Sequence, residues 1–161
     1  MGRMYSAQFS GQAVSAQQDL FQITAPSTRV VCIHGITVSQ GGGGNDVGDA
    51  QEEFLTLLMK RSTSASTSGS VGSTPTIVGL ESGAPAAGSV VMANNTTRVT
   101  GGTAYTIHSD SWNVRANFIW IPTPEMRPWL GVSERFTLEL GTTPATDAVN
   151  TNGTIYFEEV G

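Results

Sequence analysis

The sequence predicts an all-β protein, an antiparallel β-sandwich or jelly roll, and two observations carry that prediction. Glycine occurs 19 times, serine 16 times and threonine 20 times in a chain of 161 residues. Serine and threonine disfavour helix interiors, whereas threonine, valine and isoleucine suit pleated, half-buried surfaces. Short apolar stretches also alternate with turn residues, as expected of a single sandwich domain spanning residues 1–161 with about eight to ten strands.

The predicted strands follow one another along the chain, and turn residues separate them. In the first strand, Tyr5, Ala7 and Phe9 share one face. Alternation of this kind is typical of a strand with one buried face. We expect strands over residues 5–14, 19–24, 29–39, 76–80, 103–116, 118–121, 135–140 and 154–158.

Residues 50–61 fit two kinds of secondary structure. Phe54 and Leu58 lie four positions apart, as do Leu55 and Met59, and this spacing suits a helix. The same apolar run suits a strand that is buried on both faces. We expect a strand, because the neighbouring segments are strands.

Three longer segments are interpreted as loops. Residues 41–48 hold four consecutive glycines, residues 81–89 carry Pro85 among small residues, and residues 62–75 begin with a serine-rich run. Because these side chains offer little to anchor a loop, we expect flexibility near residues 41–48 and 62–75. Shortening residues 62–70 should then change the stability little.

The charge balance excludes several classes of function. Lysine and arginine number 8 against 13 acidic residues, so the formal net charge is -5. Nucleic-acid binders and polybasic membrane anchors both need clustered cations, so we expect neither nucleic acid nor membrane as a partner. No apolar run approaches the ~18 residues that a membrane-spanning helix needs. Cys32 is the only cysteine, so no internal disulfide forms, and we expect synthesis in a reducing cytoplasm.

No catalytic or metal-binding constellation can be assembled from the sequence. His34 and His108 lie in separate strand patterns, and neither has a carboxylate or cysteine beside it at ligand spacing. Asp46, Asp49 and the pair of glutamates at 52–53 surround a glycine-rich turn, but they do not fit the alternating ligands of a helix-loop-helix calcium site. We expect a non-enzymatic protein without metal or cofactor; a calcium-binding turn is the lesser alternative.

The aromatic cluster in the second half of the chain is the strongest candidate for a functional surface. Trp112, Trp120 and Trp129 fall within 18 residues of one another. Each could belong to the core, to a subunit contact or to an aromatic platform for sugar. Tryptophan, methionine and arginine are enriched in protein–protein contacts, so we expect Trp129, Met126 and Arg127 to form a subunit contact.

Several short blocks of the sequence resemble small virion structural proteins of tailed bacteriophages and prophages. The blocks are residues 19–27 (DLFQITAPS), 83–89 (GAPAAGS), 94–97 (NNTT), 112–116 (WNVRA) and 153–159 (GTIYFEE). They occur in the same order in such relatives, and the resemblance covers nearly the whole chain. These motifs are structural, so the resemblance carries over no catalytic residue.

The resemblance implies a subunit of the phage particle, made in the bacterial host cytoplasm. The implied position is the head surface, as a decoration (cement) protein that forms a homotrimer and binds the major capsid protein. A tail, baseplate or fibre component of the virion is the first alternative, and a carbohydrate-binding module that uses the tryptophans is the second. Symmetric assembly would also cover exposed sheet edges, which promote aggregation when they are free.

Overall fold

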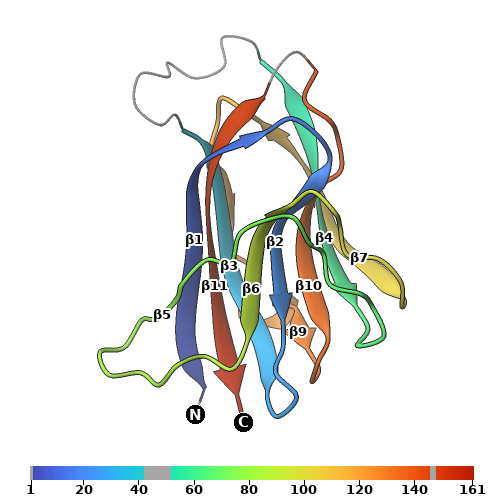
Figure 1. Ribbon diagram of the computed structural model, residues 1–161. Coiled ribbons are helices and arrows are strands. Elements are labelled where there is room, and N and C mark those ends of the chain that lie inside the picture. The colour runs from blue at the N-terminus through green and yellow to red at the C-terminus, as the bar shows by residue number, and fades with distance from the viewer. Residues whose placement is uncertain (1, 42–51, 146–147) are drawn as a thin grey trace.

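Two antiparallel β-sheets packed face to face make up the computed structural model, which describes residues 2–41, 52–145 and 148–161 (Figure 1). Sheet A has the strand order β5-β1-β11-β3-β8, and the short β9 also pairs with β3. Sheet B has the order β6-β2-β10-β4-β7. The elements are β1 (Arg3–Val14), β2 (Gln18–Thr24), β3 (Val30–Gln40), β4 (Phe54–Ser62), β5 (Ile77–Gly79), β6 (Val90–Asn95), β7 (Ala104–Asn113), β8 (Phe118–Trp120), the 3₁₀ turn η1 (Pro124–Met126), β9 (Trp129–Leu130), β10 (Arg135–Leu140) and β11 (Val149–Val160).

The strand order is that of a jelly roll. When β5, β6 and β9 are set aside, the remaining strands pair first with last (β1 with β11) and second with seventh (β2 with β10). The third pairs with the sixth (β3 with β8), and the fourth with the fifth (β4 with β7). A ribbon of such pairs that wraps around itself gives two facing sheets. The prediction of an all-β antiparallel sandwich is confirmed.

The core lies between the two sheets and follows from the period-two alternation of the strands. Tyr5 on β1 and Phe157 on β11 are buried, and their rings stack with centroids 5.7 Å apart. Gly153 on β11 is required by its neighbours, since a Cβ there would lie 2.6 Å from a ring carbon of Phe9. The aromatic residues of β1 and β2 therefore close over the glycine and seal this part of the core.

The predicted strands are found with changed limits. Residues 54–62 form β4, so the interpretation of the ambiguous segment as a strand is confirmed over its described part. Two strands were not predicted: β6, which ends at Asn94 and Asn95 with a positive φ of 56° at Asn94, and β9, which has only two residues. Residues 42–48 of the glycine-rich loop lie outside the described residues. Within the described ranges, no helix has the length and apolar character needed to cross a bilayer.

The serine-rich segment forms backbone hydrogen bonds with a second stretch of the chain. Residues 63–73 and 96–103 run antiparallel to each other, and we call these two stretches the covering ribbon. Thr67 pairs with Thr100 and Ser70 with Thr97, with N–H···O distances of 2.7 Å for Thr67 to Thr100 and 2.9 Å for Ser70 to Thr97. Beyond them, Ser73 pairs with Ala93 on β6, so the ribbon also occupies the outer edge of that strand.

The covering ribbon lies on the outer face of sheet B, where it satisfies polar side chains that would otherwise face water (Figure 1). Gln22 on β2 is fully buried. Its Nε2 donates to Oγ of Ser68 (2.6 Å), and its Oε1 accepts from the backbone N–H of Gly69 (2.8 Å). The small side chains let the ribbon approach the sheet closely: a Cβ at Gly69 would lie 2.7 Å from the amide nitrogen of Asn95.

We expect Gln22→Ala to lower the free energy of unfolding by roughly 1–3 kcal/mol, because it leaves the buried N–H of Gly69 in the ribbon and the Nδ2 of Asn95 on β6 without this acceptor. Thermal unfolding followed by circular dichroism checks this result. Gln12→Ala is the matched control, since Gln12 is exposed. Equal melting temperatures for the two variants would show that the ribbon is not packed as described.

Candidate functional site

The segment that connects β8 to β10 carries the three predicted contact residues. Pro124 opens η1 at a position where its missing N–H costs nothing, and the turn closes at Met126. The backbone then returns to the sheet, because the N–H of Ile33 donates to the carbonyl of Pro128 at 3.0 Å. This geometry leaves Met126 66% exposed and Trp129 49% exposed.

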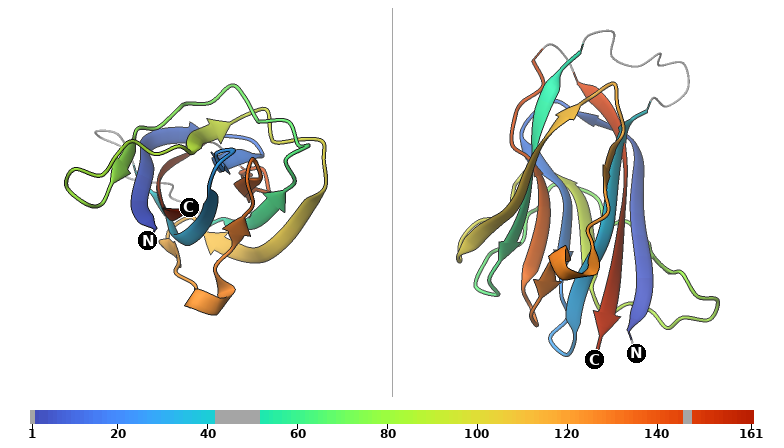
Figure 2. Two further views of the ribbon diagram at one scale, coloured as in Figure 1. Left: turned by 90° about the horizontal axis from the view of Figure 1, so that it is seen from below. Right: turned by 180° about the vertical axis from the view of Figure 1, so that it is seen from behind.

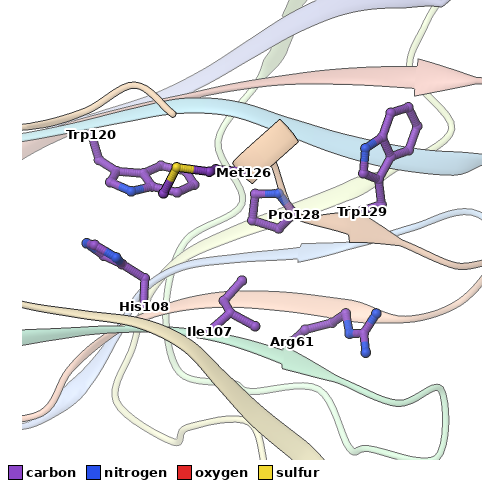
Figure 3. A pocket seen from close by; sticks show the side chains of 7 residues that line it. All are labelled: Arg61, Ile107, His108, Trp120, Met126, Pro128 and Trp129. Carbon is purple, nitrogen blue, oxygen red and sulfur yellow. The ribbon is translucent and has the colours of Figure 1, made fainter. Parts of the chain in front are cut away.

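Met126 and Trp129 line a pocket of about 200 Å³ on the open side of the sandwich (Figure 3). Its first wall comes from sheet A and η1 and consists of Trp120, Met126, Pro128 and Trp129. Its second wall comes from sheet B and consists of Arg61 on β4 and of Ile107 and His108 on β7. Figure 2 (left) shows η1 projecting from the sandwich beside β7. The pocket therefore lies between one edge of sheet A, at β8 and β9, and the edge of sheet B at β7.

A β-bulge shapes the second wall of the pocket. The register of β4 and β7 shifts between the pairs Met59–His108 and Lys60–Thr106, so Ile107 is the extra residue. Adjacent residues of a regular strand point to opposite faces, but a bulge lets two of them point the same way. Both Ile107 and His108 consequently line the pocket.

Two cationic or titratable side chains supply the pocket's polarity. The guanidinium of Arg61 lies 5.5 Å from the ring centroid of Tyr105. The imidazole of His108 lies 5.9 Å from the ring of Trp120, and its Nε2 is buried without a hydrogen-bond partner in the described part of the chain. No carboxylate is among the residues that line the pocket.

Arg127 does not line the pocket with its two neighbours. Its charge acts instead on Cys32, the buried residue that pairs with Trp129. Burial raises the pKa of the Cys32 thiol, and the nearby positive charge of Arg127 opposes that rise. Of the three predicted contact residues, the structure thus brings Met126 and Trp129 together and separates Arg127 from them.

Sequence reasoning missed the second wall of the pocket, and no signal in the sequence marks it. Arg61, Ile107 and His108 come from strands that are distant from Trp129 in the chain, and a bulge aims two of them. The three tryptophans also differ in how deeply they are buried. Trp112 is a core residue, with its Nε1 donating to the carbonyl of Ala116 at 2.7 Å, while Trp120 is half-buried and Trp129 is exposed.

The residues considered for metal binding lie apart from one another wherever the structure describes them. Nε2 of His34 lies 3.0 Å from Oε2 of Glu158, whereas His108 lies in the pocket. The carboxylate of Glu53 accepts from the N–H of Ala145 at 3.0 Å, and Asp46 and Asp49 lie outside the described residues. Across the described ranges, no three histidine, cysteine or acidic side chains gather into a metal-binding group.

A pair of buried carboxylates beneath the covering ribbon has unusual electrostatics. Asp19 on β2 is 1% exposed, and its Oδ2 accepts from the N–H of Val99 at 2.7 Å. Burial raises the pKa of Asp19 to about 6; the hydrogen bond from Val99 opposes the rise, and the charge of Glu139 adds to it. Glu139 itself accepts from Lys60 (2.7 Å) and Arg98 (3.0 Å). The cluster fastens the ribbon to the sheet by charge as well as by hydrogen bonds.

The outer face of sheet A contrasts with that of sheet B. Its central side chains form two cross-strand rows, which we call the bare face: Val78–Ser6–Tyr156–Gly35 and Gln8–Thr154–Thr37–Ile119. Neither row holds a charged residue. Val78 is 55% exposed, Tyr156 38% and Ile119 62%. Charges sit toward the end of the face, as in the His34–Glu158 pair. Figure 2 (right) shows β1, β11 and β3 side by side in this sheet.

Comparison of the chain with protein-family models, curated proteins and solved structures finds no match.

Relative to wild type, Asp19→Asn should raise the free energy of unfolding more at pH 7 than at pH 4. A carboxyl whose pKa is about 6 in the folded protein and 3.8 in the unfolded chain binds its proton more tightly when folded, so stability falls as the pH rises between these values. Asparagine does not titrate and still accepts from Val99. The variant should gain up to about 3 kcal/mol relative to wild type across that range, measured by urea unfolding at each pH. Asp110→Asn, on exposed β7, is the control; parallel pH profiles for wild type and Asp19→Asn would contradict the expectation.

Proposed function

We propose that this protein is a non-enzymatic structural subunit of a bacteriophage particle, and specifically a head decoration protein that binds the major capsid protein. One structural observation supports the proposal: another segment of the chain covers part of the outer face of sheet B, whereas the outer face of sheet A is exposed. The chain's own covering ribbon lies over β2 and β10 of sheet B and leaves Phe54 of β4 exposed, whereas the bare face of sheet A carries exposed apolar side chains and no charge in its central rows. A subunit of a larger particle needs one surface that faces solvent and one surface that binds its partner.

The dimensions of the bare face suit a stable protein–protein contact. β1, β3 and β11 have 11 or 12 residues each, so these three strands, spaced by ~4.8 Å, give a face roughly 35 Å long and roughly 15 Å wide. The three-residue strands β5 and β8 widen it only in the middle, and the resulting area of roughly 600 Å² is below the ~800 Å² that each partner buries in a standard interface but within reach of it once flanking loops contribute. The absence of charge in the central rows lowers the cost of removing water from the face.

Resemblance of short sequence blocks to phage virion proteins supports the placement on a particle, and the sequence expectation of a homotrimer is part of the proposal. A tail, baseplate or fibre subunit would have the same fold and the same need for a docking face. A carbohydrate-binding module is supported less well. Trp120 and Trp129 share one pocket, but its lining lacks the carboxylate and amide groups that bind sugar hydroxyls.

The proposed assembly predicts a trimer in solution. Light scattering coupled to size-exclusion chromatography should give about three times the chain mass of 16.9 kDa at micromolar concentration. Dilution to nanomolar concentration should shift the distribution toward smaller species, because association depends on concentration. A monomer that persists at tens of micromolar contradicts the trimer.

Ile119→Arg should prevent incorporation of the protein into particles, because it places a charge on the bare face that docking would have to desolvate. Ser64→Arg introduces the same residue at an exposed position of the covering ribbon, and this variant should be incorporated normally. Co-sedimentation with virions measures incorporation, and cryo-electron microscopy should show the protein on the head with the bare face buried. Normal incorporation of both variants, or density on the tail, would overturn the head-docking proposal.

A further inference from the structure

The longest open strand edge of the described chain borders the aromatic pocket. β7 has ten residues and pairs only with β4 in the described ranges. At the outer edge of β6, Ala93 pairs with Ser73 of the covering ribbon, and in sheet A the outer edge of β1 has no described strand partner from Gln8 to Val14, where a bulge interrupts it. From His108 to Asn113, beyond the bulge, β7 keeps a regular register with β4. Its unpaired backbone groups can therefore accept another strand.

The pocket lies where a side chain of an added strand would point. A strand that extended sheet B beyond β7 would direct alternate side chains inward, toward Trp120, Met126 and Trp129 on the opposite wall (Figure 3). The pocket's volume of about 200 Å³ is below the ~300–1,000 Å³ of typical small-molecule sites. It suits one large apolar side chain better than a free ligand.

The charges beside the pocket specify what flanks that apolar side chain. At one end, Arg61 stacks on Tyr105 and forms no ion pair with a described residue. At the other end, Asp110 lies two positions beyond His108, on the same face of β7 and exposed. An added strand would therefore meet an anion at Asp110, the apolar pocket beside His108 and, beyond the bulge, a cation at Arg61.

We propose that the β7 edge binds an extended segment of a partner protein by strand addition. Every strand pair in both sheets is antiparallel, so the added strand runs antiparallel to β7. Its recognition pattern, from N- to C-terminus, is a basic residue opposite Asp110, a large apolar residue in the pocket and an acidic residue opposite Arg61. One residue separates the basic residue from the apolar one, and the acidic residue follows C-terminal to them, beyond the bulge. This site is distinct from the bare face and does not depend on a place in a virion.

Selection from a displayed library of random linear dodecapeptides against the purified protein tests the site. Enriched peptides should share the basic–x–apolar pattern with an acidic residue C-terminal to it and, as synthetic peptides, should shift NMR amide signals of residues 104–113. Trp129→Ala should weaken their binding at least tenfold, as expected for an exposed aromatic anchor. Leu80→Ala, an exposed apolar residue on the other side of the molecule, is the control and should change nothing.

Arg61→Glu provides an independent readout, because selection on that variant should replace the acidic residue of the pattern with a basic one. Failure to enrich any peptide, enrichment of a different pattern, or signal shifts away from β7 would overturn the proposal. Dimerisation of the protein through β7 itself would also overturn it, because a second copy would then be the occupant. None of these results bears on particle incorporation, which the Ile119→Arg variant reports separately.

Discussion

A buried polar side chain has to find hydrogen-bond partners, and on sheet B these partners come from the covering ribbon. Gln22 and Asp19 lie on a sheet face that would ordinarily be wet, yet both are almost completely buried. Backbone N–H groups of Gly69 and Val99 donate to them. These contacts hold two long connections against the sheet, cover the edge of β6 and give the molecule a finished outer face.

The consequences for function follow from what the ribbon leaves uncovered. Sheet A keeps a flat outer face whose central rows carry no charge, and β7 keeps an open edge beside an aromatic pocket. Exposed surfaces of this kind promote unwanted association unless a partner occupies them. The proposed function assigns the bare face to a contact with the particle, and the separate proposal for the β7 edge assigns that edge to an extended segment of a partner protein.

The sequence predicted the fold class well because apolar and polar residues alternate along a strand that has one buried face. It also predicted a strand for residues 50–61 from context alone, and β4 covers residues 54–62. It did not indicate the contacts of the covering ribbon, because low complexity removes local signals while Gln22 and Asp19, distant in the chain, supply the hydrogen-bond partners. The site was half predicted for a similar reason: Met126 and Trp129 are neighbours in sequence, but Arg61, Ile107 and His108 reach them only through the jelly-roll order and a bulge in β7.

The most direct test of whether the covering ribbon is held against sheet B is hydrogen–deuterium exchange of the free protein at the amides of Gly69 and Val99. If the covering ribbon seals sheet B, both amides exchange far more slowly than an unstructured chain, and Gln22→Ala and Asp19→Ala speed exchange at their respective partners. Exchange of both amides at the unstructured rate in the wild-type protein would contradict the account, since sheet B would then have an open outer face like that of sheet A.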